Sequence, residues 1–120
     1  MHEIGIANSI VDAVREEMKL YPGGIARRVT VRIGELAAVD PEALRFGFQA
    51  ITRETELESL ELEIERCPRI HRCEPCDFDF PVRDFDYRCP QCKSEQTQCV
   101  GGQQLELAHL ELEEHEPRSA

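Results

Sequence analysis

The first part of the chain carries two successive patterns of apolar positions. Between residues 4 and 20, apolar residues recur every three or four positions, at Ile4, Ala7, Val11, Val14 and Met18. This period predicts an amphipathic helix, and the Pro-Gly-Gly segment at residues 22–24 ends it. Further on, every second residue is apolar, at Val29, Val31 and Ile33. Alternation of this kind predicts a strand with one buried face.

A second helix and a second strand follow. The run Asp40-Pro41-Glu42 combines an N-cap aspartate, a proline at the first helical position and an acid in the first turn. The buried stripe of this helix is predicted at Leu44, Phe48 and Ile51. After it, apolar residues alternate with glutamates at Leu60, Leu62 and Ile64, which predicts a half-buried strand.

The closing segment, QQLELAHLELEE, predicts a third strand. Its leucines change from odd positions, Leu105 and Leu107, to even positions, Leu110 and Leu112. A bulge near Ala108-His109 would keep all four on one face of the strand. We therefore expect an α+β fold in which two helices pack on a three-stranded sheet. Residues 67–102, which hold all six cysteines, would be a module inserted into the domain formed by residues 1–66 plus 103–116, with 117–120 as a tail.

Charge and composition narrow the classes of function. The 120 residues include 24 acidic and 14 basic side chains, which gives a formal net charge of −10. Proteins that bind nucleic acid usually carry a basic patch, so we expect no nucleic-acid partner. The sequence has neither a long apolar run nor a signal peptide, which predicts a cytoplasmic protein without a membrane span. Because disulfides are rare in the cytoplasm, the cysteines are interpreted first as metal ligands.

Four of the cysteines form two CxxC pairs, Cys73 with Cys76 and Cys89 with Cys92, separated by twelve residues. Two such pairs are the usual way to place four thiolates around a tetrahedral zinc ion. Four protein ligands leave no position for water, so this Zn²⁺ would be structural. Two disulfides, a redox CxxC pair and a rubredoxin-like iron site are the alternatives, each less consistent with the compartment or the spacing.

Three further residues accompany this cluster. Cys67 and Cys99 lie outside the four-cysteine pattern, and we expect them to be small buried side chains, with a spare thiol pair or extra ligands as the alternative. His71 precedes Cys73 by two residues and is expected at the surface or beside the ligands rather than on the metal.

The N-terminus, Met1-His2-Glu3, offers a second set of metal ligands. We expect Met1 to be retained, because the next residue is large. The Met1 amine, the His2 backbone nitrogen and the His2 imidazole could then chelate one ion in a plane, with Glu3 or a partner as the fourth ligand. Such a plane suits Ni²⁺ or Cu²⁺. Taken alone, however, a histidine at position two is more often an ordinary exposed residue.

Four features taken together resemble the HypA/HybF family of hydrogenase maturation factors. These are the MHE start, the block VRIGELAAVDPEALRFGFQAIT, the doubled CxxC and the closing LELAHLELEE. The resemblance implies a nickel metallochaperone whose cargo Ni²⁺ binds His2 with the Met1 amine and the Glu3 region. It also implies that Cys73, Cys76, Cys89 and Cys92 bind structural zinc.

The same resemblance implies partners: a HypB-type GTPase and the large subunit of [NiFe]-hydrogenase. It leaves open whether urease is also a client and whether the chain forms a homodimer. No arrangement of catalytic residues predicts an enzyme. A zinc-ribbon module associated with nucleic acid or transcription remains the alternative interpretation, and it is disfavoured by the net charge of −10. The roles of Cys67, Cys99, His71 and His109 stay open.

Overall fold

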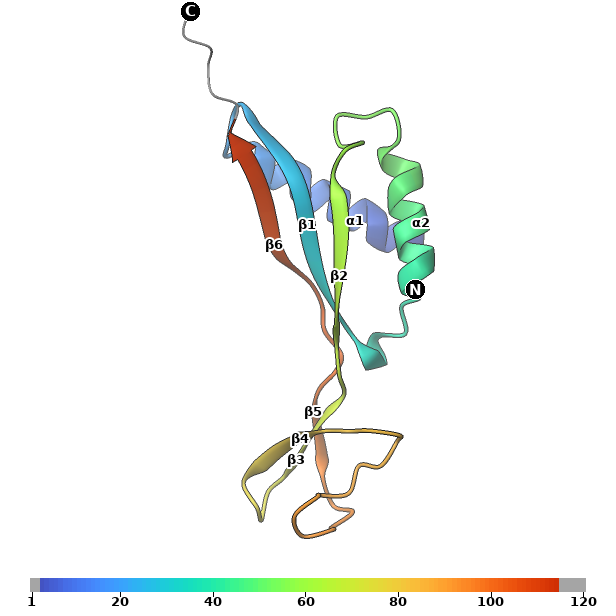
Figure 1. The fold of residues 1–120 in the computed structure, drawn as a ribbon, viewed down its shortest axis with the longest axis vertical. Coiled ribbons are helices and arrows are strands. Elements are labelled where there is room, and N and C mark those ends of the chain that lie inside the picture. The colour runs from blue at the N-terminus through green and yellow to red at the C-terminus, as the bar shows by residue number, and fades with distance from the viewer. Residues whose placement is uncertain (1–2, 115–120) are drawn as a thin grey trace, which may run out of the picture. The chain divides into compact units, whose positions relative to one another are not determined.

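The computed structural model describes residues 3–114, and this part of the chain forms two compact units. The helical unit consists of residues 3–31, 39–64 and 107–114, and the cysteine unit consists of residues 32–38 and 65–106. The three longest strands run from one unit into the other (Figure 1).

Helix α1 (Glu3–Met18) confirms the first predicted helix and ends two residues earlier than expected. Its buried positions are Ile6, Ala7, Ile10, Val11 and Val14. The expectation that Ile4 belongs to this stripe is wrong, because its side chain remains 47% exposed. Ile4 lies beside the neighbouring helix at Gly47, where an added Cβ would come within 2.8 Å of the Ile4 Cδ1 atom. A glycine at that position therefore lets the two helices approach closely.

Helix α2 (Pro41–Thr52) begins as the sequence predicts. The Asp40 carboxylate accepts hydrogen bonds from the backbone N–H groups of Glu42, at 3.0 Å, and Ala43, at 3.4 Å. These two donors have no partner inside the helix, so the cap stabilises the first turn. Leu44 and Phe48 are fully buried, and α2 packs against α1.

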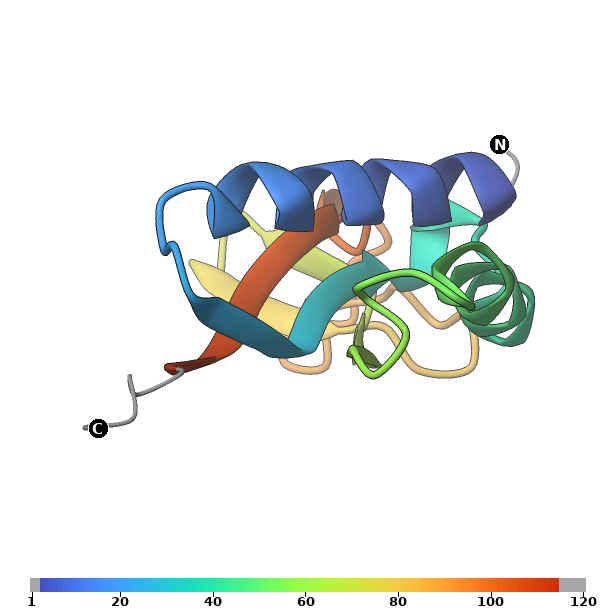
Figure 2. The same cartoon turned by 90° about the horizontal axis from the view of Figure 1, so that it is seen from above.

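The larger sheet contains three strands in the order β2-β1-β6. They are β1 (Gly24–Gly34), β2 (Glu61–Cys67) and β6 (Leu105–Glu114). Val29 and Val31 of the central strand are almost completely buried, as their alternation predicted. Within the helical unit, α1 lies across one face of the sheet, as Figure 2 shows. The predicted fold, two helices on a three-stranded sheet, is confirmed.

Strand β6 is less buried than its leucines suggested. Leu107, Leu110 and Leu112 are half-buried, but Leu105 is exposed at 40%, so the expectation that all four share a buried face is wrong. Leu105 lies in the part of β6 that belongs to the cysteine unit, whereas the three half-buried leucines lie in the helical unit. The bulge near Ala108-His109 stays a prediction.

The cysteine unit contains a small antiparallel sheet in the order β4-β3-β5. Its strands are β3 (Ile70–Cys73), β4 (Phe78–Pro81) and β5 (Gln98–Gly101). A short 3-10 helix, η1 (Glu35–Ala37), belongs to the same unit and is held by a hydrogen bond from the Leu36 N–H to the Gly102 carbonyl, at 2.7 Å. A Cβ on Gly34 would lie 2.1 Å from that carbonyl oxygen, so this close approach requires glycine.

Candidate metal centre

Two tight turns of the cysteine unit present the four cysteines of the CxxC pairs. The first turn follows β3 and is closed by the Asp77 N–H, which donates to the Glu74 carbonyl at 3.0 Å. In the second turn, the Lys93 N–H donates to the Cys89 carbonyl at 2.8 Å. The residue that follows each pair, Asp77 or Lys93, has a positive φ, 51° and 64° respectively. Each turn therefore reverses the chain directly after its second cysteine.

The four sulfur atoms converge on one point. The Sγ atoms of Cys73, Cys76, Cys89 and Cys92 all lie within 4.8 Å of one another. The Sγ atoms of Cys73 and Cys92 are 3.6 Å apart. Sulfurs at about 2.3 Å from a tetrahedral zinc ion would be separated by about 3.8 Å. The donor set and its spacing therefore fit Zn²⁺, which prefers thiolates to hard oxygen ligands.

The electrostatics of the cluster also call for a cation. The backbone N–H of Cys92 donates to the Cys89 sulfur and lowers the pKa of that thiol to about 7. By contrast, the neighbouring Cys92 sulfur, together with burial, raises the pKa of Cys76 to about 12. Four thiolates held this closely repel one another, and a divalent ion between them removes that penalty.

A small apolar cluster lies beside the ligands. Cys73 and Cys89 are fully buried against Phe80 and Val82, and the partly buried Phe78 packs on the same cluster. The Phe78 and Phe80 rings stack with their centroids 6.2 Å apart. Such a small core can contribute only a few kcal/mol to stability, so a metal ion held by the four cysteines would supply much of the stability of the unit.

His71 has a structural role that the sequence did not reveal. Its side chain is 4% exposed, so of the two expected positions, at the surface or beside the ligands, the surface position is wrong. As expected, His71 is not among the four residues of the sulfur cluster. Its Nε2 atom accepts a hydrogen bond from the Arg69 guanidinium at 2.9 Å, which leaves the proton on Nδ1. Nδ1 lies 2.9 Å from the Thr97 hydroxyl, and that hydroxyl donates to the Tyr87 carbonyl at 2.7 Å. Burial, with a smaller effect of Arg69, lowers the pKa of His71.

Comparisons with known proteins agree with this arrangement. The family model for hydrogenase/urease nickel incorporation metallochaperones, HypA, matches residues 1–112. The chain belongs to the HypA family.

Relatives and solved structures cover almost the whole chain. The hydrogenase maturation factor HypA of Roseiflexus sp. (strain RS-1) is 41% identical over 122 residues, which span 99% of this chain and 98% of the relative. The factor of the same name from Chlorobaculum parvum is 35% identical over 113 residues, 94% of this chain and 100% of the relative. The solution structure of the nickel metallochaperone HypA from Helicobacter pylori superposes with a TM-score of 0.65 at 26% identity, covering 96% of this chain and 100% of that one.

The HypA nickel site predicted at the N-terminus falls mostly outside the described residues. Met1 and His2 lie outside them, and Glu3 is the first residue of α1. A carboxylate oxygen of Glu3 lies 3.5 Å from the Asp40 backbone nitrogen, which donates to it. The start of α1 is therefore tied to the start of α2 in this HypA chain.

The two remaining cysteines do not join the cluster. Cys67 is half-buried at the end of β2, whereas Cys99 is exposed on β5, so the expectation that Cys99 is buried is wrong. In the register of the small sheet, Cys99 lies opposite His71. His109 is exposed on β6. Within residues 3–114, no helix of this HypA chain has both the length and the apolar character needed to cross a membrane.

Proposed function

We propose that this chain is a nickel metallochaperone that binds Ni²⁺ at its N-terminus and delivers it during maturation of [NiFe]-hydrogenase. The ligands are the Met1 amine, the backbone nitrogen and imidazole of His2, and the Glu3 region. One observation carries the proposal: the nickel-incorporation family model matches from residue 1 to residue 112, so it includes the MHE start. A site with few ligands at a chain end can release its ion by ligand exchange with an acceptor.

We further propose that Cys73, Cys76, Cys89 and Cys92 hold a permanent structural Zn²⁺. Four converging sulfurs within 4.8 Å of one another support this assignment. Their ion would have no open coordination position, so it would organise the cysteine unit and would not activate water. The two sites then differ in how firmly they must hold their ion: the zinc stays bound, whereas the nickel is transferred to an acceptor.

The two proposed metal sites belong to different domains of the chain. Residues 1–66 plus 103–116 form the nickel-binding domain, residues 67–102 form the zinc module, and residues 117–120 are a tail. The two compact units support a division close to this one. The differences are that Arg32–Ala38, at the end of β1 and in η1, cluster with the cysteine unit, and that this unit also includes residues 65–66 and 103–106.

The partners follow from this role. We propose that the chain works in the cytoplasm with a HypB-type GTPase and the large subunit of [NiFe]-hydrogenase, and that it binds cargo without catalysing a reaction. A homodimer and a urease client belong to the same proposal. A net charge of −10 disfavours nucleic acid as a partner. A pull-down with the host's HypB-type GTPase, beside a DNA-binding assay at low salt, separates these functions.

Nickel calorimetry on the chain with its native Met1 tests the main proposal. His2→Ala should abolish most of the Ni²⁺ binding while the zinc content and circular dichroism stay unchanged. His109→Ala is the matched control, because it removes an exposed histidine of β6 and should leave Ni²⁺ binding intact. Equal Ni²⁺ binding by the native chain and His2→Ala would place the ion elsewhere. In that case Cys67, His71, Cys99 and His109 are the next candidates.

A further inference from the structure

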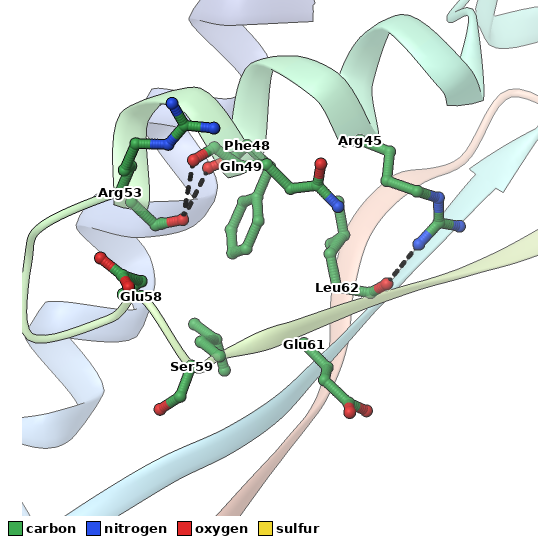
Figure 3. A pocket seen from close by; sticks show the side chains of 10 residues that line it. Arg45, Phe48, Gln49, Arg53, Glu58, Ser59, Glu61 and Leu62 are labelled. Carbon is green, nitrogen blue, oxygen red and sulfur yellow. Dashed lines mark hydrogen bonds between the residues drawn. The ribbon is translucent and has the colours of Figure 1, made fainter.

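A groove runs between α2 and β2 in the helical unit. It encloses a cavity of about 550 Å³, whose base is formed by Phe48 of α2, by Leu60 just before β2 and by Leu62 of β2. Figure 3 shows the Phe48 ring pointing from the helix toward the strand. The groove therefore combines a small apolar base with mostly polar walls.

The strand that lines this groove has a free edge. In the order β2-β1-β6, β2 has β1 as its one neighbour. The Leu62 carbonyl instead accepts a hydrogen bond from the Arg45 guanidinium of α2, at 2.7 Å (Figure 3). Because the backbone groups of a strand alternate in direction, those of Ile64 point to the same side as those of Leu62. Such an edge is a template for the addition of another strand.

The cations of the groove differ from the other cations of the helical unit. Arg15, Lys19, Arg27 and Arg28 each form an ion pair with a glutamate. Arg45 and Arg53 also line the groove. Among the described residues, no carboxylate oxygen lies within 4.0 Å of their guanidinium nitrogens.

The two acids at the rim form no ion pair with these arginines. The Glu58 carboxylate accepts the Glu54 backbone N–H. Glu61 pairs with Arg28 at 3.5 Å, and Figure 3 shows its carboxylate directed away from α2. The lining of the groove, with two arginines and two glutamates, therefore has no net formal charge in a chain of net charge −10, and its two cations have no carboxylate partner among the described residues.

We propose that this groove binds an extended acidic segment of a partner protein, which adds to the β2 edge as a further strand. The backbone of the segment would pair with Leu62 and Ile64, and its carboxylates would bind Arg45 and Arg53. In the free protein, the Arg45 hydrogen bond covers the Leu62 carbonyl and protects the edge. This docking site is separate from the proposed nickel ligands, so either proposal can fail without the other.

The spacing of the two arginines defines the segment. Arg53 follows the last residue of α2, eight positions after Arg45, which corresponds to a rise of roughly 12 Å along the helix. Four residues of extended chain span roughly 13 Å. Side chains at positions i, i+2 and i+4 share one side of such a segment, so an apolar side chain at i+2 would face Phe48 and a carboxylate at i would reach Arg45. The Arg53 side chain, which Figure 3 shows directed away from β2, would turn toward the carboxylate at i+4.

The proposal is tested by fluorescence anisotropy with the zinc-loaded full chain and a labelled peptide Glu-Thr-Val-Thr-Glu, blocked at both ends. We expect saturable binding, and no binding of the peptide with lysine in place of both glutamates. Arg53→Glu should weaken binding about tenfold or more, as expected for a lost charge-assisted contact. Lys19→Glu makes the same charge change at an exposed cation outside the groove and should change binding less than about twofold.

Hydrogen exchange gives the structural readout: the amides of Leu62 and Ile64 should exchange more slowly with the peptide bound. If Arg53→Glu proves unfolded by circular dichroism, Arg53→Gln takes its place, with the same expected loss. The proposal is overturned if the glutamate peptide does not bind, or if Lys19→Glu weakens binding as much as Arg53→Glu. It is also overturned if sedimentation shows self-association that Arg53→Glu abolishes, because the groove would then hold a second copy of this chain.

Discussion

The Nδ1 atom of His71 lies 2.9 Å from the hydroxyl oxygen of Thr97, 26 residues further along the chain. Thr97 in turn donates to the Tyr87 carbonyl, two residues before the ligand Cys89. The pair therefore connects the strand that precedes the first CxxC turn with the loops on both sides of the second turn. Both ring nitrogens of His71 have hydrogen-bond partners within the protein, which is the environment of a structural histidine.

Thr97→Val should destabilise the cysteine unit. Valine keeps the shape but leaves the His71 Nδ1–H and the Tyr87 carbonyl without their partner, which costs about 1–3 kcal/mol. We expect faster transfer of zinc to a chelator and a lower midpoint of thermal unfolding. Gln98→Val is the control, because Gln98 is exposed on β5 and the substitution again introduces valine. Equal zinc transfer from the two variants would show that the hydrogen-bonded pair contributes nothing.

Cys76→Ser should remove most of the bound zinc and loosen residues 67–102. A hydroxyl is a poor replacement for a thiolate, and zinc supplies on the order of 10 kcal/mol of folding free energy in small zinc modules. Elemental analysis and hydrogen exchange measure the two effects. Cys99→Ser, the same change at an exposed cysteine outside the cluster, should retain one zinc per chain. A full zinc content in Cys76→Ser would contradict the four-ligand assignment.

Strand β6 should stabilise the helical unit through its half-buried leucines. Leu110→Ser should lower the free energy of unfolding by about 1–2 kcal/mol, somewhat less than the value for a fully buried leucine. Leu105→Ser should cost less, because Leu105 is 40% exposed. Urea denaturation of both variants measures the difference. Truncation after Gly102 removes all of β6, and a fragment 1–102 that still folds cooperatively would refute the contribution of this strand.

Arg28 should matter more than an ordinary surface arginine. Its guanidinium lies 3.5 Å from Glu61, 3.5 Å from Glu63 and 3.9 Å from Glu111, with the side chain 43% exposed. Arg28→Ala leaves three carboxylates of neighbouring strands facing one another. We expect a loss of about 1 kcal/mol in unfolding free energy at low salt, decreasing as salt screens the repulsion. A loss that does not change between low and high salt would exclude this electrostatic origin.

Acid should release the nickel. Protons compete with the metal for an imidazole, whose ordinary pKa is about 6.5, and for an α-amino group, whose ordinary pKa is about 8. The apparent affinity for Ni²⁺ should therefore fall as the pH decreases through this range. Acetylation of the Met1 amine should also weaken binding, because an amide nitrogen that keeps its proton does not ligate. Calorimetry at several pH values, with and without the acetyl group, measures both effects, and affinities that do not respond to either change would exclude the N-terminal chelate.

Features that depend on neighbours in the sequence could be predicted without a structure. The Asp40 cap needs only the two backbone N–H groups that follow it, and the CxxC pairs bring two sulfurs together within a few residues. The two helices and three main strands follow from the period of their apolar residues. The combination of the MHE start, the GEL block and the doubled CxxC was specific enough to identify the HypA family.

Burial and pairing depended on the tertiary structure. Ile4 matches the apolar period of its helix and Cys99 is small and apolar, yet both are exposed, because exposure depends on which distant segments cover a residue. The role of His71 and the lack of an acidic partner for Arg45 and Arg53 within residues 3–114 were equally hidden in the sequence. Each of these features depends on which residues from distant parts of the chain lie nearby. The packing of helices and strands determines those neighbours.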